Sequence, residues 1–418
     1  MSKRAVIAAV FVTSAFVDAP SYIDTGAVSL MGILTVIFAA ILAFLALVEI
    51  RASFAGLCRL WPLSVLFAFS CGQFLSHTFS VQAAQTLCLQ WIFLALIVLV
   101  SNGETYGIDE ASLSRYLQHA TLFASICFLG IFLAQGFGSQ GVGAISFIQA
   151  RSYALFALLG ISFFAARWAL GFRASLWTAA ALILLVAVSL SRTALVTAIL
   201  LLPLSRLQSF SRRNLKRLLA LGVLACITLY CLVFSIDALR ERFVGDNTVQ
   251  DYVSGEATVD TSGRLAAWGV TLVSYVDSPW IGKGPGSAND LIDDVLARLE
   301  IGHPLNEYLR FLHDEGIVGL LLFLLGFGQL LRLCWRAYVQ SLARELPDAV
   351  FHLATFLALF AALITMLTDN TASYIFIMGP LGVMVGVTLS SLSPELAPAE
   401  NALNPDALPE PGIARGGL

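Results

Sequence analysis

The chain has 418 residues, of which 58% are hydrophobic and 12% are charged, and its formal net charge is -3. Charged residues make up roughly 25% of an ordinary soluble domain, so this composition excludes a soluble globular protein. The small net charge gives no reason to expect a nucleic-acid partner. All seven cysteines lie in or beside apolar runs, which indicates neither a disulfide framework nor a thiolate metal site.

Apolar runs fill most of the sequence, and a helix needs about 20 apolar residues to cross a bilayer. We predict an all-α, polytopic transmembrane helix bundle of about 12 spans, with one long extracytoplasmic loop that contains short amphipathic helices. The spans are expected near residues 5–19, 27–48, 61–76, 83–100, 116–134, 152–170, 174–190, 192–208, 217–236, 316–335, 349–367 and 373–391.

Two of these boundaries require a choice. The first run is short and follows Lys3 and Arg4, so a signal peptide competes with a first span; Asp18 and the lack of a clear cleavage site favour the span. The run from Arg173 to Pro203 is long for one helix. We divide it at SLSRT, because an arginine at mid-membrane costs roughly 2.5 to 3.5 kcal/mol.

Lysine and arginine predict the orientation, because short cytoplasmic loops are enriched in both. The segment SRLQSFSRRNLKR is rich in them, whereas DAPSYIDTG, SHTFSVQ and TDNTAS contain none. The N-terminus is therefore expected in the cytoplasm. The chain then divides into a bundle of about nine spans, an extracytoplasmic loop that carries the site, three C-terminal spans and a disordered cytoplasmic tail, at residues 1–236, 237–315, 316–391 and 392–418.

The long loop contains two amphipathic segments on either side of a glycine-rich turn. In SGRLAAWGVTLVSYV an apolar face at helical spacing, with Ser262 as N-cap, predicts a helix on the membrane surface; that face consists of Leu265, Trp268, Leu272 and Tyr275. The glycines of DSPWIGKGPGS permit tight turns or the close approach of a ligand, and Lys283 lies among them. ANDLIDDVLARLE reads as a second helix; its aspartates could hold a metal, but a solvated face is favoured because no D-x-D arrangement is present.

Polar residues gather where the loop returns to the membrane. Pro304 is expected to start the helix that becomes the tenth span. Asn306, Arg310 and His313 follow at spacings that place them on one helix face, with His303 just before. A cap or an interfacial anchor is the structural alternative for each of them.

Two further arginines, Arg151 and Arg192, stand at the outer mouths of spans six and eight. Ionisable groups at such depths need partners, and an anionic ligand would serve. Arginine binds phosphate with a planar fork, so several arginines could hold a pyrophosphate. Snorkelling to lipid head groups is the alternative.

The segments SRTALV, SGRLAAW, SPWIGKGPGS and HPLNEYLRFLHDEGIVGLLLF occur in this order over residues 189–323. Together with the long outer loop, this pattern resembles the O-antigen ligase and O-antigen polymerase superfamily. One position departs from it, because Leu305 stands where the family commonly has His directly before the Asn of this motif.

The resemblance implies a glycosyltransferase of lipopolysaccharide or polysaccharide biosynthesis in the bacterial inner membrane, with the long loop in the periplasm. Such enzymes use no metal and no other cofactor. They transfer a glycan from undecaprenyl pyrophosphate to an acceptor hydroxyl, on lipid A-core for a ligase or on a lipid-linked repeat unit for a polymerase. Membrane lipid is a further partner, and a regulator of chain length is left open.

For this chain we expect a ligase-type, inverting and metal-independent transfer. The expected catalytic group comprises His303, Asn306 and His313, with His303 as base or acceptor-orienting residue. Pyrophosphate would be held by Arg192, Arg264 and Arg310, with Arg151 and Lys283 as second choices. A polymerase is the alternative within this class. A flippase or transporter is less favoured, because its internal repeats and midplane helix breaks are not evident.

Overall fold

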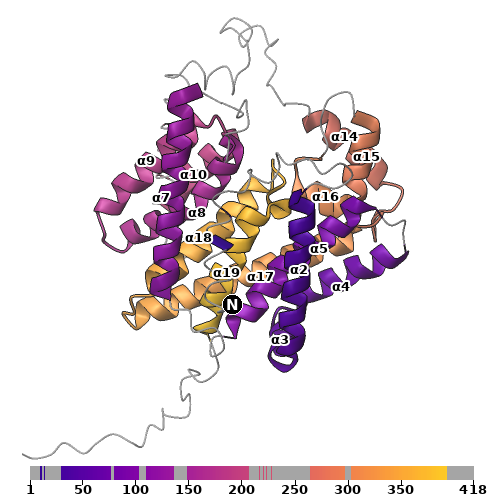
Figure 1. Ribbon diagram of the computed structural model, residues 1–418, viewed down its shortest axis with the longest axis horizontal. Coiled ribbons are helices and arrows are strands. Elements are labelled where there is room, and N and C mark those ends of the chain that lie inside the picture. Colours follow the sequence, from indigo (N-terminus) through magenta and orange to yellow (C-terminus); the bar gives the residue numbers. More distant parts are fainter. Residues whose placement is uncertain are drawn as a thin grey trace, which may run out of the picture.

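The computed structural model describes residues 10, 11, 14, 30–76, 80–102, 110–135, 148–206, 216, 220, 223, 227, 264–296 and 303–392. Every element in this described part is a helix, as Figure 1 shows, so the all-α prediction is confirmed. The expected spans at 5–19 and 217–236 and the tail after residue 392 lie almost entirely outside the described residues, as does the predicted N-cap Ser262.

Ten of the expected spans coincide with described helices. These are α2 (Leu30–Val48), α4 (Trp61–Ser76), α5 (Val81–Ser101), α7 (Glu110–Gln135), α8 (Ala150–Ala169), α9 (Ala174–Val188), α10 (Arg192–Ser205), α17 (Gly316–Ala343), α18 (Ala349–Thr365) and α19 (Ile375–Ser390). The remaining elements are α3 (Ile50–Arg59), α14 (Arg264–Tyr275), α15 (Ser287–Leu296), α16 (Glu307–Asp314) and the 3-10 turn η3 (Thr371–Ser373).

Four of the described helices, α5, α7, α8 and α17, are long and apolar enough to cross a membrane. A fifth span results if α2 and α3 are counted as one broken pair, since they meet at a bend of 105°. The other five apolar helices, α4, α9, α10, α18 and α19, have between 10 and 17 residues. The chain is therefore a multi-pass helical protein of the membrane type, but the count of about 12 spans is not confirmed.

The centre of the bundle consists of α5, α8, α18 and α19. All of α8 from Tyr153 to Ala166 is buried, and α19 is buried from Phe376 to Leu389. The outer helices α2, α4, α7 and α17 instead carry exposed apolar side chains along one face, including Leu47, Leu75, Leu133 and Leu325. A helix that is apolar all round is buried in this way, and exposed apolar stripes at the perimeter are what a lipid environment requires.

The predicted division at SLSRT is confirmed. Helix α9 ends at Val188 and α10 begins at Arg192, with Leu190 between them in the left-handed region at φ 57°. Arg192 is consequently the first residue of a helix and does not lie at the middle of a long one. The short α10 keeps the guanidinium at the end of the bundle, where it avoids the cost of an arginine in the apolar interior.

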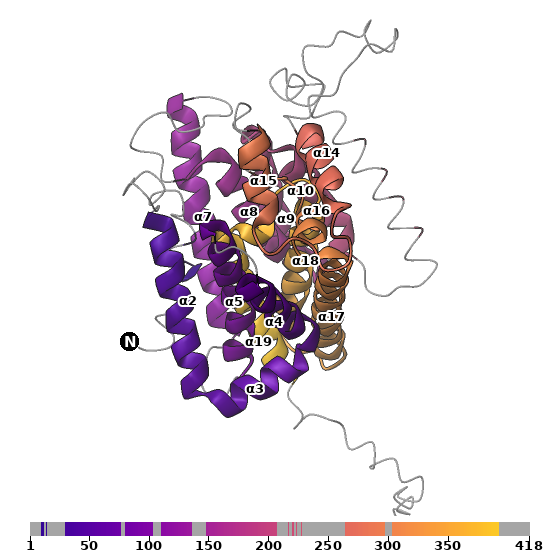
Figure 2. The same ribbon diagram turned by 90° about the vertical axis from the view of Figure 1, so that its right-hand side faces the viewer.

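The two ends of the bundle carry different polar groups. At one end α14, α15 and α16 form a cap (Figure 2). The loop before α19 joins α8 at this end through the Arg151–Asp369 ion pair. The opposite end carries α3 and the arginines of the short connections, among them Arg59, whose Nη1 donates to Leu389 O. All the described segments that were expected to be extracytoplasmic therefore meet at the capped end.

Candidate active site at the capped end

Helix α16 begins one residue after an asparagine cap. The side chain of Asn306 accepts a hydrogen bond from Leu309 N at 3.1 Å. Leu305, just before it, has φ 52°, so the backbone turns there before the helix begins. Glu307 lies in the first turn of the helix, where the dipole favours an acidic residue. Asn306 is thus engaged as a cap, and Pro304, which the sequence analysis expected as the helix start, lies outside the helix.

The helix also ends earlier than expected, because α16 stops at Asp314 and Gly316 starts the separate helix α17. Gly316 has φ 70°, and a Cβ on it would lie 2.4 Å from the carbonyl carbon of Trp280. The prediction of one continuous helix into the tenth span is therefore wrong. The chain is broken here because the Trp280 backbone passes so close that only glycine fits.

Within α16, Arg310 forms a buried ion pair with Glu307. Arg310 Nε donates to Glu307 Oε2 at 2.5 Å, and the two side chains are 4% and 0% exposed. Glu307 also accepts from Ser373 Oγ at 3.2 Å, and its amide donates to Met366 O at 2.9 Å. The charge of Arg310 is therefore balanced inside the protein, and the pair ties α16 to the loop that precedes α19.

A second arginine–carboxylate pair lies nearby and is much more open. Arg151, at the start of α8, donates from Nε and Nη2 to the two carboxylate oxygens of Asp369. The Arg151 side chain is 46% exposed, whereas Asp369 is 5% exposed. The guanidinium also lies 5.7 Å from the centre of the Tyr374 ring. This bidentate contact fixes the orientation of the fork and leaves one side of it in contact with solvent.

His303 lies within electrostatic reach of both pairs. Its side chain reaches solvent, yet the protein around it removes enough water to lower the pKa of the imidazole from its ordinary value. The carboxylate of Asp293 opposes this shift, and the guanidinium groups of Arg310 and Arg151 add to it. The imidazole is therefore neutral at neutral pH and can accept a proton.

Arg192 and Arg264 stand at helix N-termini on the same end of the molecule. Arg192 is the first residue of α10, and the next residue, Thr193, shares a hydrogen bond with Thr368 beside Asp369. Arg264 is the first residue of α14. One turn later, Trp268 Nε1 donates to Pro304 O at 2.8 Å and so links α14 to the chain beside His303.

His313 belongs to a different, closed network. Its Nε2 lies 3.0 Å from Ser274 Oγ and its Nδ1 lies 3.2 Å from Ser287 Oγ, and the side chain is 1% exposed. Asp314 beside it accepts from Gly286 N, Ala288 N and Ser287 Oγ, so it caps α15. His313 and His303 are therefore not brought together, and His313 connects α14, α15 and α16.

Lys283 is engaged in the same cap. Its Nζ donates to Asp277 Oδ2 at 2.7 Å and to Ser274 Oγ at 2.9 Å. The glycines around it have φ of 74°, 99° and 80° at Gly282, Gly284 and Gly286, so the predicted tight turns are confirmed. The close approach is to the protein itself, because a Cβ on Gly282 would lie 2.3 Å from Asp314 O.

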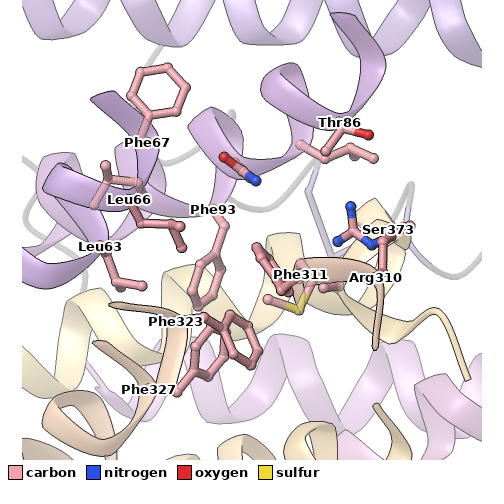
Figure 3. A pocket seen from close by; sticks show the side chains of 15 residues that line it. Leu63, Leu66, Phe67, Thr86, Phe93, Arg310, Phe311, Phe323, Phe327 and Ser373 are labelled. Atoms are coloured by element: carbon pink, nitrogen blue, oxygen red, sulfur yellow. The ribbon is translucent and has the colours of Figure 1, made fainter. Parts of the chain in front are cut away.

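A small cavity of about 50 Å³ lies behind α16, between α4, α5, α17 and α19. Figure 3 shows its aromatic wall, formed by Phe93, Phe311, Phe323 and Phe327, with Arg310 and Ser373 together at one end. The ring centres of Phe311 and Phe323 are 4.3 Å apart. The packed rings lie next to the buried Arg310–Glu307 pair. The volume of the cavity suits water-sized groups and not a sugar.

Residues 177–324 match the family model described as O-antigen ligase. This part of the chain is therefore similar to the O-antigen ligase family. No curated protein matches the chain. The family supports a membrane-bound, glycosyltransferase-like activity of the ligase or polymerase type, with lipid-linked glycans as the general class of substrate.

The matched segment contains most of α9, all of α10, α14, α15 and α16, and the start of α17. It therefore includes most of the expected site residues, namely Arg192, Arg264, Lys283, His303, Asn306, Arg310 and His313. Arg151 and its partner Asp369 lie outside the matched segment, before and after it in the chain. The capped end is thus assembled from the matched segment and from parts of the chain on both sides of it.

The acidic residues at the capped end were not predicted from the sequence. Asp369 lies in TDNTAS, which was considered only as a loop without lysine or arginine, and Glu307 was not singled out as a site residue. Both carboxylates are almost fully buried. An acidic residue beside an apolar run is costly without a partner, so this signal could have indicated that each of them pairs with an arginine. Among the described residues no group of three or more His, Cys, Asp or Glu could hold a metal ion.

Proposed function

We propose that the protein transfers a glycan from undecaprenyl pyrophosphate to an acceptor hydroxyl at the periplasmic face of the inner membrane, as an O-antigen ligase with lipid A-core as acceptor. The observation that carries this proposal is the Arg151 guanidinium, held by Asp369 and half exposed, within electrostatic reach of His303 at the capped end. A polymerase that joins lipid-linked repeat units would use the same donor and the same cationic groups.

The pyrophosphate would be bound by arginines at three helix N-termini. Arg151 is the second residue of α8, while Arg192 and Arg264 are the first residues of α10 and α14. The N-terminus of a helix carries roughly half a positive charge, which favours anions at the same positions as these guanidinium groups. The exposed fork of Arg151 makes it the strongest candidate for direct, bidentate contact.

Arg310 has a less direct role in this proposal. Its guanidinium is buried and paired with Glu307, so a phosphate would have to displace an internal carboxylate to reach it. We infer that Arg310 contributes its electrostatic field and holds α16 against the loop of Ser373. Lys283 is similarly engaged by Asp277, so it is a weaker candidate than the arginines at the helix ends.

The chemistry requires no covalent intermediate. Pyrophosphate is already a good leaving group, so the protein must hold it, spread its developing charge and align the acceptor hydroxyl on the opposite face of the anomeric carbon. The C–O bond to pyrophosphate breaks as the bond to the acceptor oxygen forms, which inverts the configuration. The neutral imidazole of His303 takes the acceptor proton, and Asn306 orients the hydroxyl from the start of α16.

The deciding experiment is reconstitution of the purified protein with a defined undecaprenyl pyrophosphate glycan and two acceptors in parallel. Consumption of lipid A-core supports the ligase, and consumption of the lipid-linked repeat supports the polymerase. If glycan remains on the donor with both acceptors while it crosses the bilayer, the protein is a flippase and the transfer proposal is wrong. The Arg151→Ala variant serves as the negative control, since loss of the fork should stop transfer to either acceptor.

A further inference from the structure

A band of exposed apolar side chains runs along the outer side of the cap. We call residues 272–281 the exposed lip; they form the end of α14 and the turn that follows it. Within it Val273, Val276 and Trp280 are 75%, 70% and 67% exposed, and Ile281 is 54% exposed. Val273 lies in the last turn of α14, and the other three lie in the turns that follow it. Large apolar side chains are seldom left in contact with water in so compact a group.

The direction of the exposed lip is fixed by contacts on the opposite face of α14. Ala267 and Thr271 are 0% and 1% exposed, and Trp268 Nε1 donates to Pro304 O. Ser274 Oγ contacts the imidazole of His313. Because these contacts hold the helix against α16, α14 cannot turn its apolar side inward. The predicted face of this helix is therefore divided, with Trp268 toward the protein and Leu272, which is 44% exposed, toward the outside.

The exposed lip is continuous with the perimeter of the bundle. Val318 N of α17 donates to Trp280 O, and Gln73 of α4 donates to Ile281 O. Below Val318, Leu321 and Leu325 continue down the same face of α17 and are 53% and 54% exposed. Figure 2 shows α14 above α17 on the same side of the molecule. The surface that lipid chains must cover on α17 thus extends without interruption onto the cap.

We propose that the exposed lip is inserted in the bilayer leaflet at the capped end, where it anchors the cap and sets its depth. The occupant of this surface is the region of lipid just below the head groups. Asp277 of the exposed lip forms an ion pair with Lys283, two residues beyond it, and this pair marks the level of the head groups. Tryptophan prefers that boundary, so Trp280 would lie there with its ring among the upper parts of the acyl chains.

The test uses the intrinsic fluorescence of Trp280, obtained as the difference between the wild type and Trp280→Phe in phospholipid vesicles. Two vesicle preparations carry bromine either near the head groups or near the chain ends, and iodide is the aqueous quencher. We expect the emission of Trp280 to fall by at least about twofold in the lipid brominated near the head groups, with little effect of iodide.

The matched control is Trp268→Phe on the same helix. The Trp268 indole faces the protein and donates to Pro304 O, so its emission should respond to neither brominated lipid. Quenching of Trp280 by iodide, with no response to either lipid, would show that the exposed lip is in water and would overturn the proposal. This outcome does not depend on glycan transfer, so it separates the anchor from the proposed activity.

Discussion

The capped end contains a closed half and an open half. In the closed half, His313 and Asp314 are buried and bonded to serines and backbone amides of α14 and α15. In the open half, His303 and Arg151 keep one side toward solvent. Both histidines lie on the same polar stretch of sequence. The residue type therefore does not decide which histidine is available for chemistry; the number of fixed partners decides it.

The two arginine–carboxylate pairs repeat this contrast. The Arg310–Glu307 pair is buried on both sides, whereas the Arg151–Asp369 pair buries the carboxylate and leaves the guanidinium half exposed. A fully buried pair stabilises one arrangement but cannot easily exchange partners. A half-exposed pair can accept a phosphate with little loss of its existing contacts. Substitutions in the closed and the open half should therefore affect stability and transfer differently.

The largest effect is expected from Asp314→Ala, which removes the centre of the closed half. The amides of Gly286 and Ala288 would lose their acceptor in a buried position, so the free energy of unfolding should fall by about 3 kcal/mol or more. Thermal unfolding in detergent, followed by tryptophan fluorescence, measures this loss. An unchanged unfolding midpoint would contradict a structural role for the closed half.

The two histidines should respond in opposite ways. His303→Ala should lower the turnover rate by about 10²-fold and leave the unfolding midpoint unchanged. His313→Ala should lower the free energy of unfolding by about 1 to 3 kcal/mol, and with it the unfolding midpoint, because Ser274 and Ser287 lose a buried partner. Transfer assays and thermal unfolding of both variants test this. The reverse pattern would assign catalysis to the closed half.

The pH dependence of transfer sharpens the assignment of His303. Because the pKa of its imidazole is lowered, the neutral form persists below the ordinary value for histidine. Transfer should stay constant as the pH falls to about 6.5 and decline only below it. The acid limb should disappear in the residual activity of His303→Ala. A limb that remains in this variant would belong to another group.

Arg151→Lys tests the fork while keeping the charge opposite Asp369. Lysine cannot form the bidentate contact, so transfer should fall by about tenfold while the unfolding midpoint changes little. Arg167→Lys is the matched control, since Arg167 lies at the other end of the same helix, over the ring of Phe172. Equal losses in both variants would contradict a specific role of the capped end.

The final effect, on the pH dependence of stability, concerns Glu315, which is buried at the junction of α16 and α17 and bonded to Ser70 and Gln90. Burial raises the pKa of its carboxyl to about 8. The folded protein then binds a proton that the unfolded chain releases, so stability is full below the unfolded pKa and is lost as the pH rises through about 8. Glu315→Gln should remove this slope, up to about 1.4 kcal/mol per pH unit. Unfolding midpoints across this pH range provide the measurement.

The sequence predicted the helices well, because apolar runs and their breaks are local features. It placed the break before Arg192 and the turns at Gly282 and its neighbours. It could not predict that Asp369 meets Arg151, since Arg151 lies in α8 and Asp369 in the loop before α19, and no periodicity links them. The break at Gly316 was also missed, because it depends on the passing backbone of Trp280 and not on the apolar pattern of α17 itself.

The crossing of two chain segments at Gly282 and Gly316 has a consequence for how this protein can vary. At both positions even a methyl group would meet backbone atoms closer than 3.0 Å, whereas Gly269 and Gly328 have open space around them. In a saturation mutagenesis library, the first two positions should therefore tolerate no replacement, while the other two accept small residues. Substitutions in the surrounding sequence are limited by this close crossing of two backbone segments, because neither segment can move away without the other.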